Sequence, residues 1–141
     1  MTNQTEYKLL NVVLVKCNFE RSGSVHFDKE KTEQNLDVEI SFNSQKEGVL
    51  YIELKVQYWA GIQENEKAVE AEIIMGGAFK YEGEPNPPLN VFGEINGPAI
   101  LFPFVREQLA NLTMKAGLNT VLLPPVNFVK LAEERKKNTN Q

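Results

Sequence analysis

The stretch GPAILFPFVRE, residues 97–107, decides how the second half of this chain is organised, because it combines large apolar side chains with two prolines. The apolar residues that follow have helical spacing: they are Phe102, Val105, Leu109 and Leu112. Pro103 has no backbone N–H and is tolerated in a first helical turn, so we expect a helix to begin close to it and to run to Lys115. Gly117 is a suitable C-terminal cap.

This helix is apolar on more than one side. Besides its main stripe it carries Leu101, Phe104 and Met114, and one sheet face cannot cover all of these side chains. Apolar residues all round a helix imply burial on several sides. We therefore expect self-association through the helix, as a dimer or a dimer of dimers. The predicted interface residues are Leu101, Phe102, Val105, Leu109 and Leu112.

Four segments before the helix alternate apolar and polar residues at period two, which predicts strands. They are residues 7–19, 36–42, 50–59 and 69–75. The first is apolar on both faces in its middle, as in a strand that is covered on both sides. Since the others alternate, we predict an antiparallel sheet with one buried and one wet face. With a last helix after the N-cap residue Asn127, the predicted fold is α+β: a four-stranded antiparallel sheet followed by two helices.

The wet face of this sheet is acidic. Its charged residues are Asp37, Glu39, Glu53, Glu70 and Glu72, opposed by Lys55. Two interpretations of such a face stay open. Either it keeps the protein soluble, or it docks a basic partner, since like charges gathered on one face steer association.

The chain of 141 residues has a net charge of −4 and the composition of a globular protein. We expect one domain over residues 1–141, with residues 1–5 and 138–141 disordered. There is no long apolar run and no basic-then-apolar N-terminus, so neither a membrane span nor a signal peptide is predicted, which favours the cytoplasm. No basic stripe indicates a nucleic-acid partner.

No group of side chains predicts catalysis. Cys17 is the single cysteine and His26 the single histidine, which disfavours a disulfide, a multi-cysteine metal site and a histidine-activated nucleophile. The glycines follow neither a phosphate-loop nor a dinucleotide pattern. We therefore predict no enzyme, no metal and no cofactor. An enzyme with a small-molecule pocket in the connection 80–99 is kept as the alternative from a different class.

Two motifs in the second half carry a resemblance. ILFPFVRE at residues 100–107, followed after a helix by PPVNF at residues 124–128, resembles the signature region of the SecB protein-export chaperone family. The end of the fourth strand, residues 76–79, is similar as well, with Glu72 four positions before its first glycine. The resemblance implies a four-stranded antiparallel sheet with two helices. It also implies a homotetramer, a dimer of dimers with the long helices between the sheets.

The same resemblance implies an ATP-independent holdase that binds unfolded preproteins in apolar grooves and delivers them to the SecA translocase. Exposed aromatic and flexible side chains suit such grooves, because they accept many sequences. Core packing is the alternative for each of them, and Trp59 stands out because its strand parity points it away from the core-facing set. The candidates for client binding are Phe42, Tyr58, Trp59, Phe79, Tyr81, Phe104, Phe128 and Leu131.

The resemblance assigns docking to SecA to Glu20, Glu70 and Glu72, because the family presents an acidic sheet face to that motor. Two features depart from the export members. The neighbourhood of Cys17 lacks an acidic residue that they have, and the tail, residues 129–141, is short and basic where theirs is usually acidic. These departures leave a second hypothesis open: a SecB-like chaperone dedicated to a specific client, such as the antitoxin of a toxin–antitoxin system.

Overall fold

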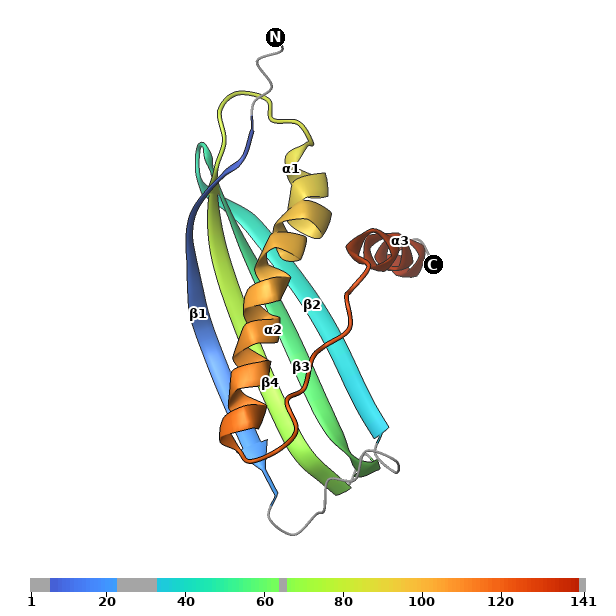
Figure 1. The fold of residues 1–141 in the computed structure, drawn as a ribbon. Helices are drawn as coiled ribbons and strands as arrows, with labels where there is room; N and C mark the ends of the chain where they lie inside the picture. Colours follow the sequence, from blue (N-terminus) through green and yellow to red (C-terminus); the bar gives the residue numbers. More distant parts are fainter. Residues whose placement is uncertain (1–5, 23–32, 64–65, 140–141) are drawn as a thin grey trace.

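The computed structural model describes residues 6–22, 33–63 and 66–139, and four strands come first in chain order (Figure 1). The strands are β1 (Lys8–Arg21), β2 (Glu33–Lys46), β3 (Val49–Gln63) and β4 (Glu66–Lys80). The helical elements are α1 (Leu89–Val91), the π-helical turn η1 (Phe92–Asn96), α2 (Gly97–Lys115) and α3 (Phe128–Thr139). His26, residues 1–5 and residues 140–141 lie outside the described residues, whereas Asn138, expected to be disordered, belongs to α3.

The strands form one antiparallel sheet in the order β1-β4-β3-β2. The pairs β2–β3 and β3–β4 are sequential neighbours, whereas β1 lies on the far side of β4. Helix α2 runs along one face of the sheet, which we call the inner face (Figure 1). The predicted α+β class, with four antiparallel strands followed by a long and a shorter helix, is confirmed.

The inner face is buried at its centre and less so at its edges. Its buried central residues are Leu50, Ile52, Leu54, Val56 and Tyr58 on β3, and Val69, Ala71, Ile73, Met75 and Phe79 on β4. The corresponding row of β2, Leu36 to Phe42, is only half-buried. A helix is about 10 Å wide and strands lie about 4.8 Å apart, so one helix covers roughly two of the four strands.

A glycine on β4 sets how closely α2 approaches the sheet. A Cβ added to Gly77 would lie 2.8 Å from Cδ2 of Leu101, and Leu101 itself is fully buried. A larger residue at this position would push the helix away from the sheet. Gly77 therefore serves helix packing, whereas a Cβ added to Gly76 would meet Tyr51 on the other face of the sheet. Strand β4 continues beyond both glycines to Lys80.

The start of α2 differs from the prediction. Helical structure begins at Leu89, within the connection 80–99, and Pro103 lies inside α2 rather than in its first turn. A proline removes the hydrogen bond to the carbonyl four residues earlier, here that of Ala99. Both Pro103 and Ala99 are exposed, so that carbonyl is accessible to water and the helix continues.

Both predicted caps are confirmed. Gly117 has φ of 75°, its N–H bonds to the carbonyl of Met114, and the N–H of Leu118 bonds to that of Thr113, which is the glycine-terminated Schellman arrangement. At the start of α3, the N–H of Lys130 donates to Oδ1 of Asn127 at 3.0 Å. These caps fix the ends of the segment 116–127 that joins the two helices.

We predict that Thr113→Val lowers the free energy of unfolding by about 1–3 kcal/mol. The buried Thr113 hydroxyl donates to the carbonyl of Leu109 and accepts the N–H of Val121, each at 3.0 Å, so valine leaves that N–H buried without a partner. Thr113→Ser, which keeps the hydroxyl, is the control and should protect the Val121 amide from hydrogen exchange as the wild type does. Equal denaturant midpoints for Thr113→Val and the wild type would contradict this role.

Candidate functional site

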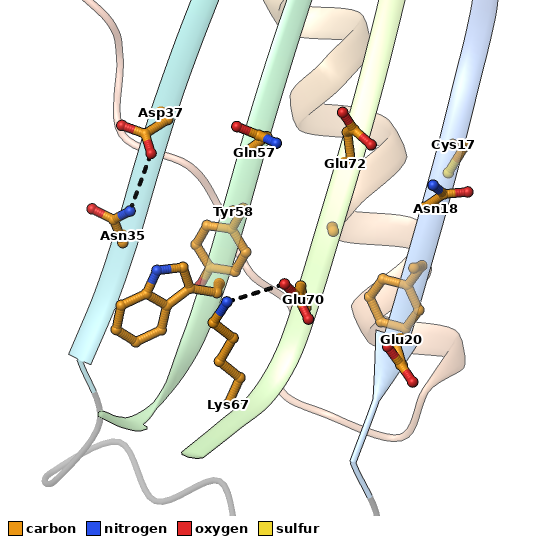
Figure 2. A pocket seen from close by; sticks show the side chains of 13 residues that line it. Cys17, Asn18, Glu20, Asn35, Asp37, Gln57, Tyr58, Lys67, Glu70 and Glu72 are labelled. Carbon is orange, nitrogen blue, oxygen red and sulfur yellow. Dashed lines mark hydrogen bonds and ion pairs between the residues drawn. The ribbon is translucent and has the colours of Figure 1, made fainter. Parts of the chain in front are cut away.

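An open hollow of about 840 Å³ lies on the sheet face opposite α2, and all four strands contribute to it (Figure 2). We call it the outer hollow. The strand registers arrange its side chains in two rows across the sheet. One row is Glu20, Glu70, Trp59 and Asn35, and the other is Asn18, Glu72, Gln57 and Asp37. The structure thus brings all three residues predicted for docking, Glu20, Glu70 and Glu72, together with Trp59.

Glu72 is held between two lysines. Its carboxylate oxygens lie 3.0 Å from Nζ of Lys16 and 3.2 Å from Nζ of Lys55. Hydrogen bonds from Lys16 and then Lys55 hold the pKa of Glu72 below its usual value. Lys55 also lies 3.7 Å from Glu39, and its hydrogen bond to Glu72 raises its own pKa. Most of the charge of Glu72 is therefore balanced within the chain.

The other acidic residues of the outer hollow are less balanced. Glu70 pairs with Lys67 at 3.1 Å, and Nζ of Lys67 lies 5.8 Å from the centre of the Trp59 ring, within range of a cation–π interaction. Within the part of the chain that the structure describes, no lysine or arginine nitrogen lies within 4 Å of the carboxylates of Glu20 or Asp37. These two exposed carboxylates give the outer hollow its uncompensated negative charge.

Sequence reasoning missed the lysines of this surface other than Lys55. Lys16 stands in a strand that is otherwise strongly apolar, and a bulge between Leu14 and Lys16 changes which face its side chain joins. Lys67 lies before the predicted start of the fourth strand. Its only sequence signal for a contact with Glu70 is the spacing of three residues. That spacing brings side chains together on a helix, whereas on a regular strand it places them on opposite faces.

Three of the side chains predicted to bind clients are buried in the single chain. Tyr58 is 3% exposed on the inner face, Phe79 packs edge-on against Phe92, and Phe128 packs edge-on against Phe102. In this conformation a client could reach them only after the segments that cover them move away. Their role in client binding stays a prediction, and the structure gives each a place in the core.

The remaining candidates are partly or well exposed. Phe42 is half-buried and lies against Gly93, where an added Cβ would come within 2.5 Å of its ring. Tyr81 and Leu131 are half-buried, and Phe104 is 40% exposed on α2. Trp59 is half-buried in the outer hollow, away from the core, as its strand parity indicated.

Helix α2 buries the stripe that we predicted for the subunit interface. Leu101, Phe102, Val105 and Leu109 are buried in the core of their own chain, and Leu112 is half-buried against it. The reason is that the sheet of the same chain already takes the regular apolar stripe. The large apolar side chains that stay exposed on the helix are Ile100, Phe104 and Met114. A second subunit at α2 would therefore meet this other face.

Strand β1 exposes a second apolar surface. Its middle was predicted to be covered on both sides, but within the described chain it is an edge strand. Its exposed large apolar residues are Leu9, Leu10, Val13, Leu14 and Val15. Five such side chains on one edge strand exceed the scattered apolar exposure that is normal for a monomer. The described residues do not supply the covering that the sequence predicts for these side chains of β1.

The connection after β4 has a packing role. Tyr7 stacks on Phe92 with ring centres 3.6 Å apart, and its hydroxyl donates to the carbonyl of Pro87 at 2.7 Å. In the described ranges no three His, Cys, Asp or Glu side chains gather in a way that could hold a metal ion. Over those same ranges, no helix is both long and apolar enough to cross a bilayer.

Comparison with known proteins settles the family. The family described as "Preprotein translocase subunit SecB" matches residues 2–139, nearly the whole chain. The chain belongs to the SecB family. Curated SecB relatives include "Protein-export protein SecB" of Halorhodospira halophila, 29% identical over 96% of this chain and 79% of the relative. The protein of the same name from Marinobacter nauticus is 30% identical over 89% of this chain and 77% of the relative.

Solved structures share the SecB fold. The Mycobacterium tuberculosis Rv1957 SecB-like chaperone, solved in complex with a ChAD peptide from the Rv1956 HigA1 antitoxin, matches with a TM-score of 0.71 and 14% identity. The match covers 85% of this chain and 90% of that one. A Streptococcus agalactiae protein of unknown function matches with a TM-score of 0.52 and 15% identity, over 85% of this chain and 98% of that one. SecB-family membership supports a chaperone role in protein export.

We predict that the wild type loses stability at high pH through Tyr58, and that the Tyr58→Phe variant does not show this loss. Burial raises the pKa of Tyr58 to about 12, whereas an unfolded tyrosine ionises near 10. Between these values the folded chain binds more protons, so the free energy of unfolding falls as pH rises, by roughly 1 kcal/mol per pH unit. Denaturant titrations of both proteins at pH 8 to 11 measure this difference.

The same substitution should leave stability at pH 7 unchanged or slightly higher. The Tyr58 hydroxyl is buried without a hydrogen-bond partner among the described residues, so phenylalanine removes an unpaired polar group and keeps the ring. A Tyr58→Phe protein that is less stable at pH 7 would show that the hydroxyl has a partner.

Proposed function

We propose that the protein is an ATP-independent holdase that binds unfolded preproteins on apolar surface and delivers them to the SecA translocase in the cytoplasm. One observation carries the holdase part: apolar side chains stay exposed at several separate places. Besides β1 and the outer side of α2, they include Leu122, which is 70% exposed, and Val129, both near the start of α3. Each client contact is worth a few kcal/mol at about 25 cal/mol per Å², so useful affinity requires several contacts on one assembly.

The outer hollow is the proposed docking surface for SecA. The support is its uncompensated charge, since Glu20 and Asp37 lack lysine partners among the described residues while Glu70 is exposed beside them. Glu72 keeps its assignment from the family resemblance. Because Lys16 and Lys55 balance its charge, we expect Glu72 to shape the sheet more than to attract a partner.

We further propose a homotetramer, a dimer of dimers. Two uncovered apolar surfaces, on β1 and on α2, would supply the two kinds of contact that such an assembly needs. A subunit placed on α2 could also provide an acceptor for Nε of Arg106, which is buried without a partner among the described residues. The apolar area is thus shared between subunit contacts and client binding.

A chaperone dedicated to one client, such as the antitoxin of a toxin–antitoxin system, is the second candidate. Two observations favour it: the fold likeness to a SecB-like chaperone solved with an antitoxin peptide, and the basic residues Lys136 and Lys137 near the end of α3. The two candidates differ in client range. A dedicated chaperone would bind one client with high affinity and protect unrelated unfolded proteins poorly.

The purified protein should suppress aggregation of a chemically unfolded preprotein during refolding, at near-stoichiometric amounts and without nucleotide. The expected light scattering falls in proportion to added chaperone, because apolar client segments are shielded when bound. A matched assay with an unrelated unfolded protein separates the general holdase from the dedicated chaperone. No suppression for either substrate would overturn the holdase proposal.

The double variant Glu20→Lys, Glu70→Lys should weaken SecA binding by at least about tenfold. An acidic docking surface calls for a basic surface on the partner, so the new lysines would face like charges across the interface, which is strongly unfavourable. Glu82→Lys, Glu84→Lys is the matched control: it makes the same change in net charge at exposed positions outside the outer hollow. Both variants should suppress aggregation as the wild type does. If the two variants bind SecA equally in a pull-down, the docking surface is elsewhere.

Phe104→Glu should shift the solution mass from tetramer to dimer, since it places a charge on the exposed face of α2. Glu107→Gln, an exposed neighbour on the same helix, is the control and should keep the wild-type mass. A wild-type protein that is monomeric by light scattering would refute the proposed assembly.

A further inference from the structure

A lysine of this chain lies over the face of its single tryptophan. Nζ of Lys67 is 5.8 Å from the centre of the Trp59 ring and 3.1 Å from Oε1 of Glu70, the ion pair that Figure 2 marks with a dashed line. Glu70 is also the cross-strand neighbour of Trp59. An aromatic ring beside a carboxylate attracts cations. The outer hollow therefore contains a cation site whose present occupant is a side chain of the same chain.

An irregularity in the sheet places Lys67 at this site. The register between β3 and β4 shifts just before Gly61, so that β4 has one extra residue, Ala68, which is buried. This bulge brings Lys67 to the same face as Glu70, although three residues separate them. A Cβ added to Gly61 would lie 2.3 Å from the carbonyl oxygen of Glu66, so the bulge needs glycine there. The position of Lys67 is thus fixed by the backbone of both strands.

Lys67 satisfies the site only in part. The distance of 5.8 Å from the ring is close to the limit of about 6 Å for a cation–π interaction. Glu20 lies directly opposite Glu70 across β1 and β4, and like charges in this position repel each other. Lys67 is paired with Glu70, and among the described residues no lysine or arginine nitrogen lies within 4 Å of the Glu20 carboxylate. This row across the sheet therefore attracts a further cation.

An arginine suits the site better than the lysine that it would replace. The guanidinium group is planar, so it can stack on an aromatic ring while its N–H groups point outward to acceptors around the ring. Glu70 and Asn35 flank Trp59 in the row across the sheet, so such acceptors lie on both sides of the ring. The ammonium group of lysine is compact and strongly hydrated. A lysine from outside would only repeat the contacts that Lys67 already makes.

We propose that the partner that docks in the outer hollow places an arginine side chain over Trp59, where it pairs with Glu70 and displaces Lys67. This inference rests on the proposed docking function of the hollow and names the chemistry that the partner presents. It gives Trp59 a task other than client binding, for which the sequence made it a candidate. Lys67 is then an internal competitor that disfavours surfaces offering only lysine.

Two short peptides are the probes, one alternating arginine with serine and the other alternating lysine with serine. Their charges are equal, so attraction to the acidic molecule as a whole is the same for both. At physiological ionic strength we expect the arginine peptide to bind at least about threefold more tightly by calorimetry. Trp59 is the single tryptophan, so tryptophan fluorescence reports on this ring alone, and the arginine peptide should change it more. Equal affinities, or unchanged fluorescence with the arginine peptide, would overturn the proposal.

Variants of the ring test whether the preference for arginine arises at Trp59. Trp59→Leu should bind the two peptides equally, because leucine offers no aromatic face. Trp59→Phe keeps a weaker aromatic face and should retain part of the preference. A Trp59→Leu protein that still prefers arginine would place the selection elsewhere and contradict the proposal. Should this variant fail to fold, the comparison of Trp59→Phe with the wild type decides in the same way.

A lysine variant tests the displacement. Lys67→Gln should bind the arginine peptide about threefold more tightly than the wild type does, because the competing cation is gone. Lys80→Gln makes the same change in net charge at an exposed position outside the outer hollow and is the matched control. Equal effects of the two variants would show that only the charge of the whole molecule matters, which would refute displacement of Lys67.

SecA binding separates this inference from the docking proposal. We expect Trp59→Leu to bind SecA at least about threefold more weakly than the wild type. If SecA binds both proteins equally, the docking proposal stands and the arginine site fails. If SecA binds neither protein, docking to SecA fails, and the two peptides alone decide whether this site selects arginine.

Discussion

Helix α2 covers the inner face of β3 and β4 and little of β1 or β2, and this limited cover determines the rest of the molecule. A helix is about 10 Å wide, while four strands span more than that. The close approach at Gly77 and Leu101 makes the central packing tight. Apolar residues of β1 then stay exposed, and those of β2 stay half-buried, within the part of the chain that the structure describes. We consider this surplus the physical basis of the proposed assembly and of the proposed client binding.

The two faces of the sheet divide the proposed tasks. The inner face and its edges carry apolar surface, suited to subunits and unfolded chains. The outer face carries a hollow in which Glu72 is balanced by two lysines, while Glu20 and Asp37 are not. Val13 of β1 is exposed on the outer face as well, but it lies outside the hollow. A docked motor and a bound client would therefore still occupy separate surfaces of the same molecule.

Much of the fold could be predicted, because the alternation of strand residues and the caps at Gly117 and Asn127 are local signals. The start of α2 could not be predicted. Pro103 is tolerated inside the helix because it and Ala99 are exposed to water, and the sequence does not show this exposure. The apolar stripe through Val105 correctly predicted a buried face of the helix. It could not show whether that face packs on the chain's own sheet or on another subunit.

The candidate site divides in the same way. The resemblance named three carboxylates as candidates for docking, and the registers between strands place them together in one hollow. The balance of charge around Glu72 depends on Lys16, whose face is set by a bulge that no sequence pattern revealed. Among the aromatic candidates, parity placed Trp59 on the outer face, but burial of Tyr58 and Phe79 depended on which segments cover them.

Native mass spectrometry of the protein mixed with an unfolded preprotein, in the absence of nucleotide, tests the central claim most directly. The account predicts an intact tetramer carrying one client chain, because surface left uncovered in each subunit is combined in the assembly. A protein that stays monomeric, or a tetramer that never carries the client, would contradict it.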